Sequence, residues 1–204
     1  MGLWTDQVVP RMANRVLDDP ALRPVRARVC SGLSGAVVEI GFGSGLNTPF
    51  YPAGVSGVAA VEPSDVAWRL AADRVATSPV PIERAGLDGQ LLPFADHSAD
   101  AALSTLTLCT IPDPVQALGE LHRVLRPGGA LHFLEHGRAE DPEVRRWQDR
   151  LTPLNRRLQG GCRPNRPIDE LLTGAGFTIS ALQRWYLPSA PRPLAAMYEG
   201  VARA

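Results

Sequence analysis

Apolar residues gather in five short runs along the middle of the chain, and segments expected to be helical separate these runs. The runs cover residues 36–40, 58–61, 80–84, 99–108 and 130–135. Short continuous apolar runs are typical of strands that are buried on both faces of a parallel sheet. Strands that alternate with helices predict an α/β fold, in which a doubly wound, mostly parallel sheet carries helices on both faces.

The two ends of the chain follow other patterns. Apolar residues recur at helical spacing over residues 1–33, where Asp19-Pro20 can cap and begin a second helix. Asp113-Pro114 is expected to begin a helix that ends near Arg126. Beyond the last apolar run we expect two helices, over 142–159 (interrupted or bent at Pro153) and 167–175, and then two strands, over 177–187 and 195–201.

The first apolar run ends in an acid, Glu39, and glycines follow at every second position, Gly41, Gly43 and Gly45. Glycine adopts positive φ and lets a ligand lie directly against the backbone. We expect this turn to lead into a helix whose free N–H groups face a ligand. The dinucleotide fingerprint G-x-G-x-x-G is a poorer match, because Leu46 stands where it needs the third glycine. A tight turn without any ligand remains the alternative.

Two further acids follow the next strands. Glu62 ends the second apolar run about 20 residues after the first glycine, the spacing of a carboxylate that binds ribose hydroxyls. Asp88 precedes Gly89 in the segment 85–94. The alternatives are a solvated acid at a strand end for Glu62 and a turn aspartate for Asp88.

The order of these signals resembles the class I S-adenosylmethionine methyltransferases. The acid and three glycines resemble their motif I, 85–94 resembles their G-D-A-E-x-L-P-F segment, and 121–134 carries nearly their L-x-P-G-G signature. The resemblance implies a Rossmann-like sheet of seven strands, a final antiparallel hairpin and N-terminal helices that close over S-adenosylmethionine or simply pack against the sheet. It places Glu39 near the ammonium of the cofactor and Asp88 near the adenine. The cofactor-binding residues that it implies are Glu39, Gly41, Gly43, Gly45, Asn47, Glu62, Pro63, Asp88, Gly89, Thr105 and Leu106.

The acceptor is expected to lie beyond the carboxyl ends of the fourth and fifth strands. The segment 104–113 lacks the Asn/Asp-Pro-Pro-Tyr/Phe motif of amino methyltransferases, which disfavours amide and exocyclic-amine acceptors. Thr107 and Cys109 are expected on the acceptor side, with ordinary packing as the alternative. His136 is the candidate general base, because imidazole accepts a proton near neutral pH, and Glu135 either orients it or lines the cofactor pocket.

Eight arginines and four acids fall within 138–166. Arg163, Asn165 and Arg166 are candidates for binding an anionic or polyhydroxylated acceptor, whereas the helical arginines are more simply a solvated face. These features favour a small-molecule hydroxyl, such as that of a sugar or polar metabolite. Segments around Cys109, His136 and Cys162 also resemble a branch with membrane-associated alkyl-thiol S-methyltransferases, so a thiol is the alternative acceptor. A non-catalytic module that keeps the cofactor pocket is the less favoured alternative.

Composition limits the remaining choices. With 204 residues and 45% hydrophobic content, the chain suits one methyltransferase domain, made of N-terminal helices (1–33), a cofactor-binding half (36–134) and an acceptor-side half (135–204). Zero net charge disfavours a nucleic-acid partner, and no apolar stretch long enough for a membrane span appears. Three widely spaced cysteines show no zinc pattern and indicate a reduced, cytoplasmic protein, so no metal is expected. A homo-oligomer is left open.

Overall fold

The computed structural model describes residues 2–204, and its centre is a sheet of seven strands. The strand order is β3-β2-β1-β4-β5-β7-β6, and β7 runs antiparallel to both of its neighbours. The strands are β1 (Gly35–Ile40), β2 (Val55–Val61), β3 (Ile82–Gly86), β4 (Ala99–Thr105), β5 (Leu125–His136), β6 (Thr178–Tyr186) and β7 (Ala196–Arg203). The predicted α/β fold with a mostly parallel sheet and a final antiparallel hairpin is confirmed.

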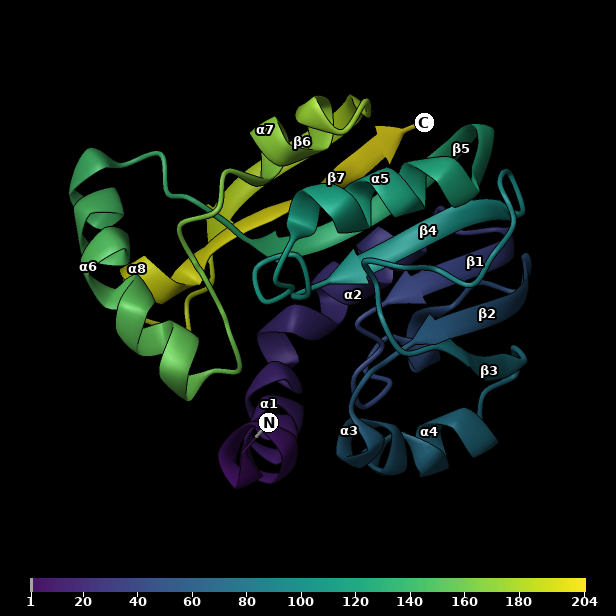
Figure 1. The fold of residues 1–204 in the computed structure, drawn as a ribbon, viewed down its shortest axis with the longest axis horizontal. Helices are drawn as coiled ribbons and strands as arrows, with labels where there is room; N and C mark the ends of the chain where they lie inside the picture. Colours follow the sequence, from purple (N-terminus) through teal and green to yellow (C-terminus); the bar gives the residue numbers. More distant parts are fainter. Residues whose placement is uncertain (1) are drawn as a thin grey trace.

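Helical segments cover both faces and the carboxyl edge of this sheet (Figure 1). They are the π-helix η1 (Trp4–Val8), the 3₁₀ turns η2 (Pro20–Leu22) and η3 (Thr48–Phe50), and α1 (Val9–Leu17), α2 (Arg23–Cys30), α3 (Asp65–Leu70), α4 (Ala72–Ala76), α5 (Pro114–Val124), α6 (Pro142–Leu158), α7 (Ile168–Gly174) and α8 (Arg192–Ala195). Within residues 2–204 we find no helix with the length and apolar character of a membrane span.

Two buried clusters hold these layers together. On one face, Leu118 and Leu121 of α5 and Leu172 of α7 pack with Val38 and other strand residues. On the other face, Val25 and Val29 of α2 pack with Val37 and Leu103. Because neighbouring residues of a strand point to opposite faces, Val37 and Val38 enter different clusters. This explains why the central strands are continuously apolar.

The carboxyl ends of β1, β2 and β4 point to the side on which α1 and α6 lie (Figure 1). The strand order reverses between β1 and β4, which are direct neighbours in the sheet. In open α/β sheets the ligand-binding crevice lies outside the carboxyl ends at such a switch point. The fold therefore places a candidate site beyond β1 and β4.

Three local expectations were wrong. The glycine turn after β1 leads only into the 3₁₀ turn η3, because Pro52 would stand in the interior of a longer helix and lacks the N–H group needed there. The strand β4 ends at Thr105 and not at residue 108, since Leu106 has a φ of +55°. The strand β5 already begins at Leu125, before the expected Gly-Gly turn.

The expected helices elsewhere are present, with small shifts of their ends. The carboxylate of Asp19 caps η2 through the N–H of Ala21, and α2 follows directly. The carboxylate of Asp113 caps α5 through two backbone N–H groups. The helix α6 is continuous through Pro153, so the expected interruption is absent from this described segment.

Candidate functional site

The acid at the end of β1 is fully buried. The carboxylate of Glu39 accepts hydrogen bonds from Asn47 Nδ2 at 2.8 Å and from the hydroxyl of Tyr51. Burial raises the pKa of Glu39 to about 7, although these two hydrogen bonds act in the opposite direction. Burial penalises the charged form of a carboxyl group, so Glu39 titrates near neutral pH.

Each of the three glycines of the turn has positive φ, but their surroundings differ. A Cβ on Gly41 would lie 1.9 Å from Thr107 Oγ1, and one on Gly45 would press on the ring of Phe42. A Cβ on Gly43 would meet only the carbonyl oxygen of Gly41, at 3.8 Å. Gly41 and Gly45 are therefore needed for packing, whereas the side of Gly43 faces open space against which a ligand can lie.

Glu62 connects the second strand to this turn. Its carboxylate accepts hydrogen bonds from the backbone N–H of Gly43 and of Ser64, each at 2.7 Å. Burial raises the pKa of Glu62, and the two N–H groups partly offset this effect. The acid thus lies at the N–H side of Gly43, and its expected binding of ribose hydroxyls stays a prediction. The neighbouring Pro63 is exposed.

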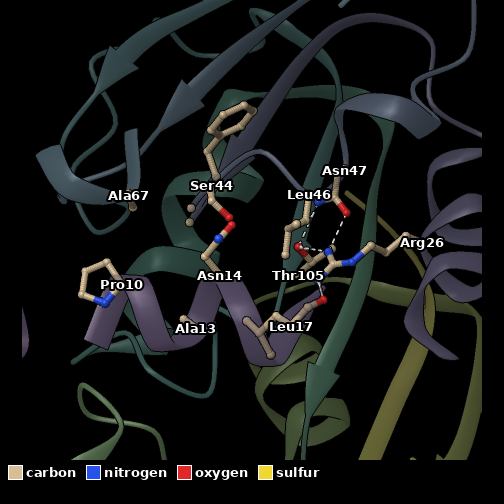
Figure 2. Close-up of a pocket in the computed structure, with 13 residues that line it drawn as sticks. Pro10, Ala13, Asn14, Leu17, Arg26, Ser44, Leu46, Asn47, Ala67 and Thr105 are labelled. Carbon is tan, nitrogen blue, oxygen red and sulfur yellow. Dashed lines mark hydrogen bonds between the residues drawn. The ribbon is translucent and has the colours of Figure 1, made fainter. Parts of the chain in front are cut away.

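A cavity of about 80 Å³ lies between the glycine turn and α1 (Figure 2). The predicted residues that line it are Gly41, Gly43, Asn47 and Thr105. The other lining residues are Pro10, Ala13, Asn14, Leu17, Arg26, Phe42, Ser44, Leu46 and Ala67. Small-molecule sites usually enclose about 300–1,000 Å³, so a nucleoside-sized ligand requires α1 to move outward.

The helix α1 is held loosely over this cavity. None of its residues is fully buried. Arg74 of α4 connects it to the glycine turn, because the guanidinium donates to Ser44 O at 3.0 Å and to Asn14 Oδ1 at 3.3 Å. A helix with few buried contacts opens at low cost, which agrees with the expected N-terminal lid.

Arg26 of α2 is a site residue that the sequence analysis missed. Its guanidinium is buried and donates to Asn47 Oδ1 at 2.7 Å, to Thr105 Oγ1 at 3.4 Å and to the carbonyl of Leu17 at 3.4 Å (Figure 2). Burial lowers the pKa of Arg26, against the attraction of Glu39. The sequence feature that could have identified Arg26 is its position next to Val25, on the apolar face of α2.

Two predicted residues after β3 lie away from the cavity. The carboxylate of Asp88 is exposed and accepts hydrogen bonds from the backbone N–H and Nε2 of Gln90. Gly89 packs closely, since a Cβ there would lie 3.0 Å from the side chain of Ile111. The observed contacts of Asp88 are those of a turn aspartate.

The loop after β4 is organised by Glu135, which is fully buried in β5. Its carboxylate accepts hydrogen bonds from Ser104 Oγ at 2.6 Å, from Thr107 N at 3.1 Å and from Cys109 N at 3.4 Å. Burial raises the pKa of Glu135, and these hydrogen bonds oppose the rise. The observed partners of Glu135 are therefore the β4 loop, and neither of its two expected roles describes these contacts.

His136 ends β5 and faces two cysteines. Its Nδ1 lies 3.9 Å from Cys162 Sγ, and the ligand atoms of Cys109, His136 and Cys162 all lie within 4.8 Å of one another. Burial would lower the pKa of His136, but the hydrogen bond with Cys109 raises it overall. The hydrogen bond with Cys109 also lowers the pKa of Cys162. Widely spaced cysteines thus meet at the carboxyl edge of the sheet.

The side chains of the loop 163–166, which were expected to bind the acceptor, form hydrogen bonds with other residues of the same chain. Arg166 is buried and its guanidinium donates to the carbonyls of Leu108 and Pro112. Arg163 Nη1 donates to the carbonyl of Pro112 at 3.3 Å, and Asn165 Nδ2 donates to Asp149 Oδ1 at 2.9 Å. These contacts support a structural role for the loop rather than the expected recognition of a polar acceptor.

Comparisons with known proteins identify the family. A methyltransferase domain family matches residues 38–133. Thiol S-methyltransferase TMT1A of Homo sapiens is 33% identical over 164 residues, which cover 78% of this chain and 67% of that protein. The chain belongs to the S-adenosylmethionine-dependent methyltransferases. Thiol S-methyltransferase TMT1B of Rattus norvegicus is 31% identical over 156 residues, which cover 74% of this chain and 63% of that protein.

The chain spans about two thirds of the length of these two relatives. Two solved structures share the methyltransferase fold over nearly the whole chain. A putative methyltransferase in complex with the Trm112 activator of Haloferax volcanii has a TM-score of 0.71 at 17% identity, over 98% of this chain and 96% of that one. A methyltransferase of Thermotoga maritima, a possible histamine N-methyltransferase, has a TM-score of 0.69 at 22% identity, over 96% and 98%.

The cofactor of the family is S-adenosylmethionine, and the geometry of the turn fits it. The open side of Gly43 is the space that a Cβ would fill, and the carboxylate of Glu62 binds the N–H of the same glycine. Arg26 and Asn47 supply polar groups to the cavity that Gly43 lines. Backbone and polar groups thus surround one cavity, as a small polar ligand requires.

Proposed function

We propose that the chain transfers the methyl group of S-adenosylmethionine to a small-molecule thiol. The observation that carries this proposal is the 164-residue similarity to thiol S-methyltransferase TMT1A. It is longer than the stretch 38–133 matched by the general methyltransferase domain, so the similarity extends beyond the cofactor-binding half. A hydroxyl acceptor is the second candidate, favoured by the position of a histidine, His136, at the carboxyl end of β5.

The cofactor side follows from the cavity. We assign the ribose to Glu62 and the open backbone at Gly43, and the amino acid end to Asn47 and Thr105, with Glu39 behind them. Arg26 joins this set, because its guanidinium orients both Asn47 and Thr105. The assignments of Gly41, Gly45, Pro63, Gly89 and Leu106 to this side, and of Asp88 to the adenine, remain predictions.

The acceptor side favours a thiol for a chemical reason. The bound cofactor supplies a methyl group on a positively charged sulfur. The acceptor loses its proton, its sulfur forms the bond to the methyl carbon, and the electrons of the broken bond stay on the cofactor sulfur. A thiol loses its proton far more readily than an alcohol, so it needs no strong base beside it. The side chains of Arg163, Asn165 and Arg166, which were expected to bind a hydroxyl acceptor, instead donate hydrogen bonds to other residues of the chain.

The test compares two acceptors that differ in one atom. Purified full-length protein is given labelled S-adenosylmethionine with hexanethiol or with hexanol, and labelled product is measured at pH 8. We expect turnover with the thiol to exceed turnover with the alcohol by at least about 100-fold, because the thiolate fraction is far larger. Titration with S-adenosylhomocysteine shows that the protein used has a working cofactor site. Preferential methylation of the alcohol contradicts the proposal.

The hydroxyl candidate makes its own prediction. There, His136 must take the acceptor proton, so His136→Ala lowers O-methylation by about 10²–10⁴-fold. His122→Ala is the control, because that ring lies on α5 against Phe177. Methylation of an alcohol that survives His136→Ala unchanged removes the general-base role.

A further inference from the structure

Three side chains with metal-binding atoms converge beside the proposed acceptor site. Cys109 lies in the loop after β4, His136 ends β5, and Cys162 lies in the loop after α6. Their ligand atoms all lie within 4.8 Å of one another, and Cys162 Sγ lies 3.9 Å from His136 Nδ1. Both cysteines are free thiols and both are buried. Three donors from three separate segments thus point at one place.

The spacing of the donors suits a tetrahedral ion. With zinc–sulfur and zinc–nitrogen distances of about 2.3 Å and 2.0–2.1 Å, donors on a tetrahedron lie about 3.5–3.8 Å apart. The distance of 3.9 Å between Cys162 Sγ and His136 Nδ1 is slightly longer than this. The other pairs, at no more than 4.8 Å, need only a small closure of the loops. Zinc and similar borderline-soft cations prefer this set of two thiolates and one imidazole.

Backbone hydrogen bonds hold the two cysteine loops in place. The backbone N–H of Cys109 donates to the carboxylate of Glu135, and its carbonyl accepts from Arg163 N at 2.8 Å. The buried Arg166 donates to the carbonyl of Leu108, which joins the loop after α6 to the loop after β4. Fixed supporting groups of this kind orient the ligands of a metal site.

We propose that Cys109, His136 and Cys162 bind one divalent zinc-type cation and leave its fourth position open. Structural zinc sites close all four positions with protein ligands, whereas catalytic sites keep one open. His136 is partly exposed, so the cluster can be reached from outside the core. In this arrangement His136 is a metal ligand and not a general base.

The use of the open position rests on the proposed thiol acceptor. A thiol that coordinates the cation gives up its proton to solvent and binds as the thiolate. The thiolate sulfur then supplies the electron pair for the new bond to the methyl carbon. The thioether that forms is neutral and a weaker ligand, so it leaves the cation. The methyl transfer itself needs no further reactant.

The metal site is tested without any acceptor. Purified full-length protein is reduced, freed of metal with a chelator and titrated with Co²⁺, which reports thiolate ligands through charge-transfer absorption. We expect one bound Co²⁺ per chain with these bands, and displacement by Zn²⁺. Cys109→Ala and Cys162→Ala should each lower the affinity at least about 10-fold. Cys30→Ala is the matched control, because Cys30 is also buried but belongs to α2 and packs in the cluster of Val25 and Val29.

A second measurement tests the metal site on the unaltered protein, so that it still applies if the variants fail to fold. X-ray absorption of the unaltered protein loaded with Zn²⁺ should show two sulfur neighbours and one imidazole nitrogen. Failure to bind Co²⁺ overturns the proposal, as does binding that survives both Cys109→Ala and Cys162→Ala. A disulfide between Cys109 and Cys162 in the protein as isolated, with no metal uptake after reduction, also overturns it.

The two proposals fail in different ways. Binding of Co²⁺ through the cluster without methylation of hexanethiol supports the site and contradicts the thiol acceptor. If protein that binds no Co²⁺ methylates hexanethiol as fast as protein loaded with metal, the thiol acceptor is supported and the metal site is contradicted.

Discussion

The cofactor side and the acceptor side of this molecule are built differently. On the cofactor side the glycine turn and its two acids make contacts that are close in the sequence: Asn47 reaches Glu39 across 8 residues, and Gly43 reaches Glu62 across 19. The exception is Arg26, which reaches Thr105 across 79 residues and which the sequence analysis missed. On the acceptor side the contacts are longer in range, such as 26 residues between His136 and Cys162, or 58 between Arg166 and Leu108. Short-range contacts leave a local pattern in the sequence, and long-range contacts do not.

The largest effect is expected at the open glycine of the cofactor side. Gly43→Ala places a methyl group in the space assigned to the cofactor, at a φ of +61°. We expect the affinity for S-adenosylhomocysteine, measured by calorimetry, to fall at least about 100-fold, which corresponds to about 2.7 kcal/mol. The left-handed backbone should also lower the free energy of unfolding by about 1–2 kcal/mol.

Gly128→Ala separates these two effects. Gly128 has a φ of +79°, is exposed, and has no neighbouring atom within 4 Å of an added Cβ. The free energy of unfolding of Gly128→Ala should therefore fall by about as much as that of Gly43→Ala, without any loss of cofactor affinity. Equal affinities of the two variants would mean that the cofactor does not lie against Gly43.

A smaller effect concerns the buried acid behind the cofactor. Burial raises the pKa of Glu39 from 4.5 to about 7, so the folded state keeps a proton that the unfolded state releases at lower pH. The free energy of unfolding should therefore fall by about 2 kcal/mol as pH rises from about 5 to about 7. Chemical denaturation of unaltered protein and of Glu39→Gln over this range measures the difference.

Glu120→Gln is the matched control for this titration. The carboxylate of Glu120 also accepts a backbone N–H, that of Leu92, but it is paired with Arg123. This pairing lowers the pKa of Glu120, so its contribution appears as a loss of stability at acidic pH. If Glu39→Gln keeps the same slope between pH 5 and 7 as the unaltered protein, Glu39 does not hold the proton.

The smallest effect tests whether the loop 163–166 is structural. Arg166→Lys keeps the charge but loses the fork that reaches the carbonyls of both Leu108 and Pro112. We expect the free energy of unfolding to fall by about 1 kcal/mol. Arg163→Lys should cost less, because Arg163 is more exposed and its guanidinium donates to Pro112 alone among the described residues. A several-fold rise in KM at unchanged stability would restore the expected acceptor role.

Much of the fold could be predicted because its signals are local. The apolar runs gave the parallel strands, and the Pro-Gly-Gly signature at 127–129 indicated the change from helix to strand, although it lies inside β5 and not before it. The errors have different causes: Pro52 prevents a longer helix after β1, which is a local signal, whereas the positive φ of Leu106, which ends β4 early, is not. The backbone angle of a single leucine follows from its surroundings and not from its type.

The residues of the candidate site also divide into those that a local sequence pattern revealed and those whose contacts only the structure shows. Glu39, the glycines and Glu62 were found from their spacing, and the structure places them around one turn. Arg26 was missed because a helical arginine in an arginine-rich chain resembles a solvated one. The loop residues Arg163 and Arg166 were expected to face an acceptor, because sequence alone does not show which carbonyls a guanidinium will reach.

The sequence by itself determined the alternation of strands and helices, the glycine turn and its two acids, because each of these signals is carried by a short stretch of the chain. Only the tertiary structure decided what lies at the carboxyl ends of β4 and β5. There Cys109, His136 and Cys162 are separated by 26 residues or more, yet their ligand atoms meet within 4.8 Å. The physical reason is the parallel sheet, which brings the ends of distant strands to one edge, whatever the length of the chain between them.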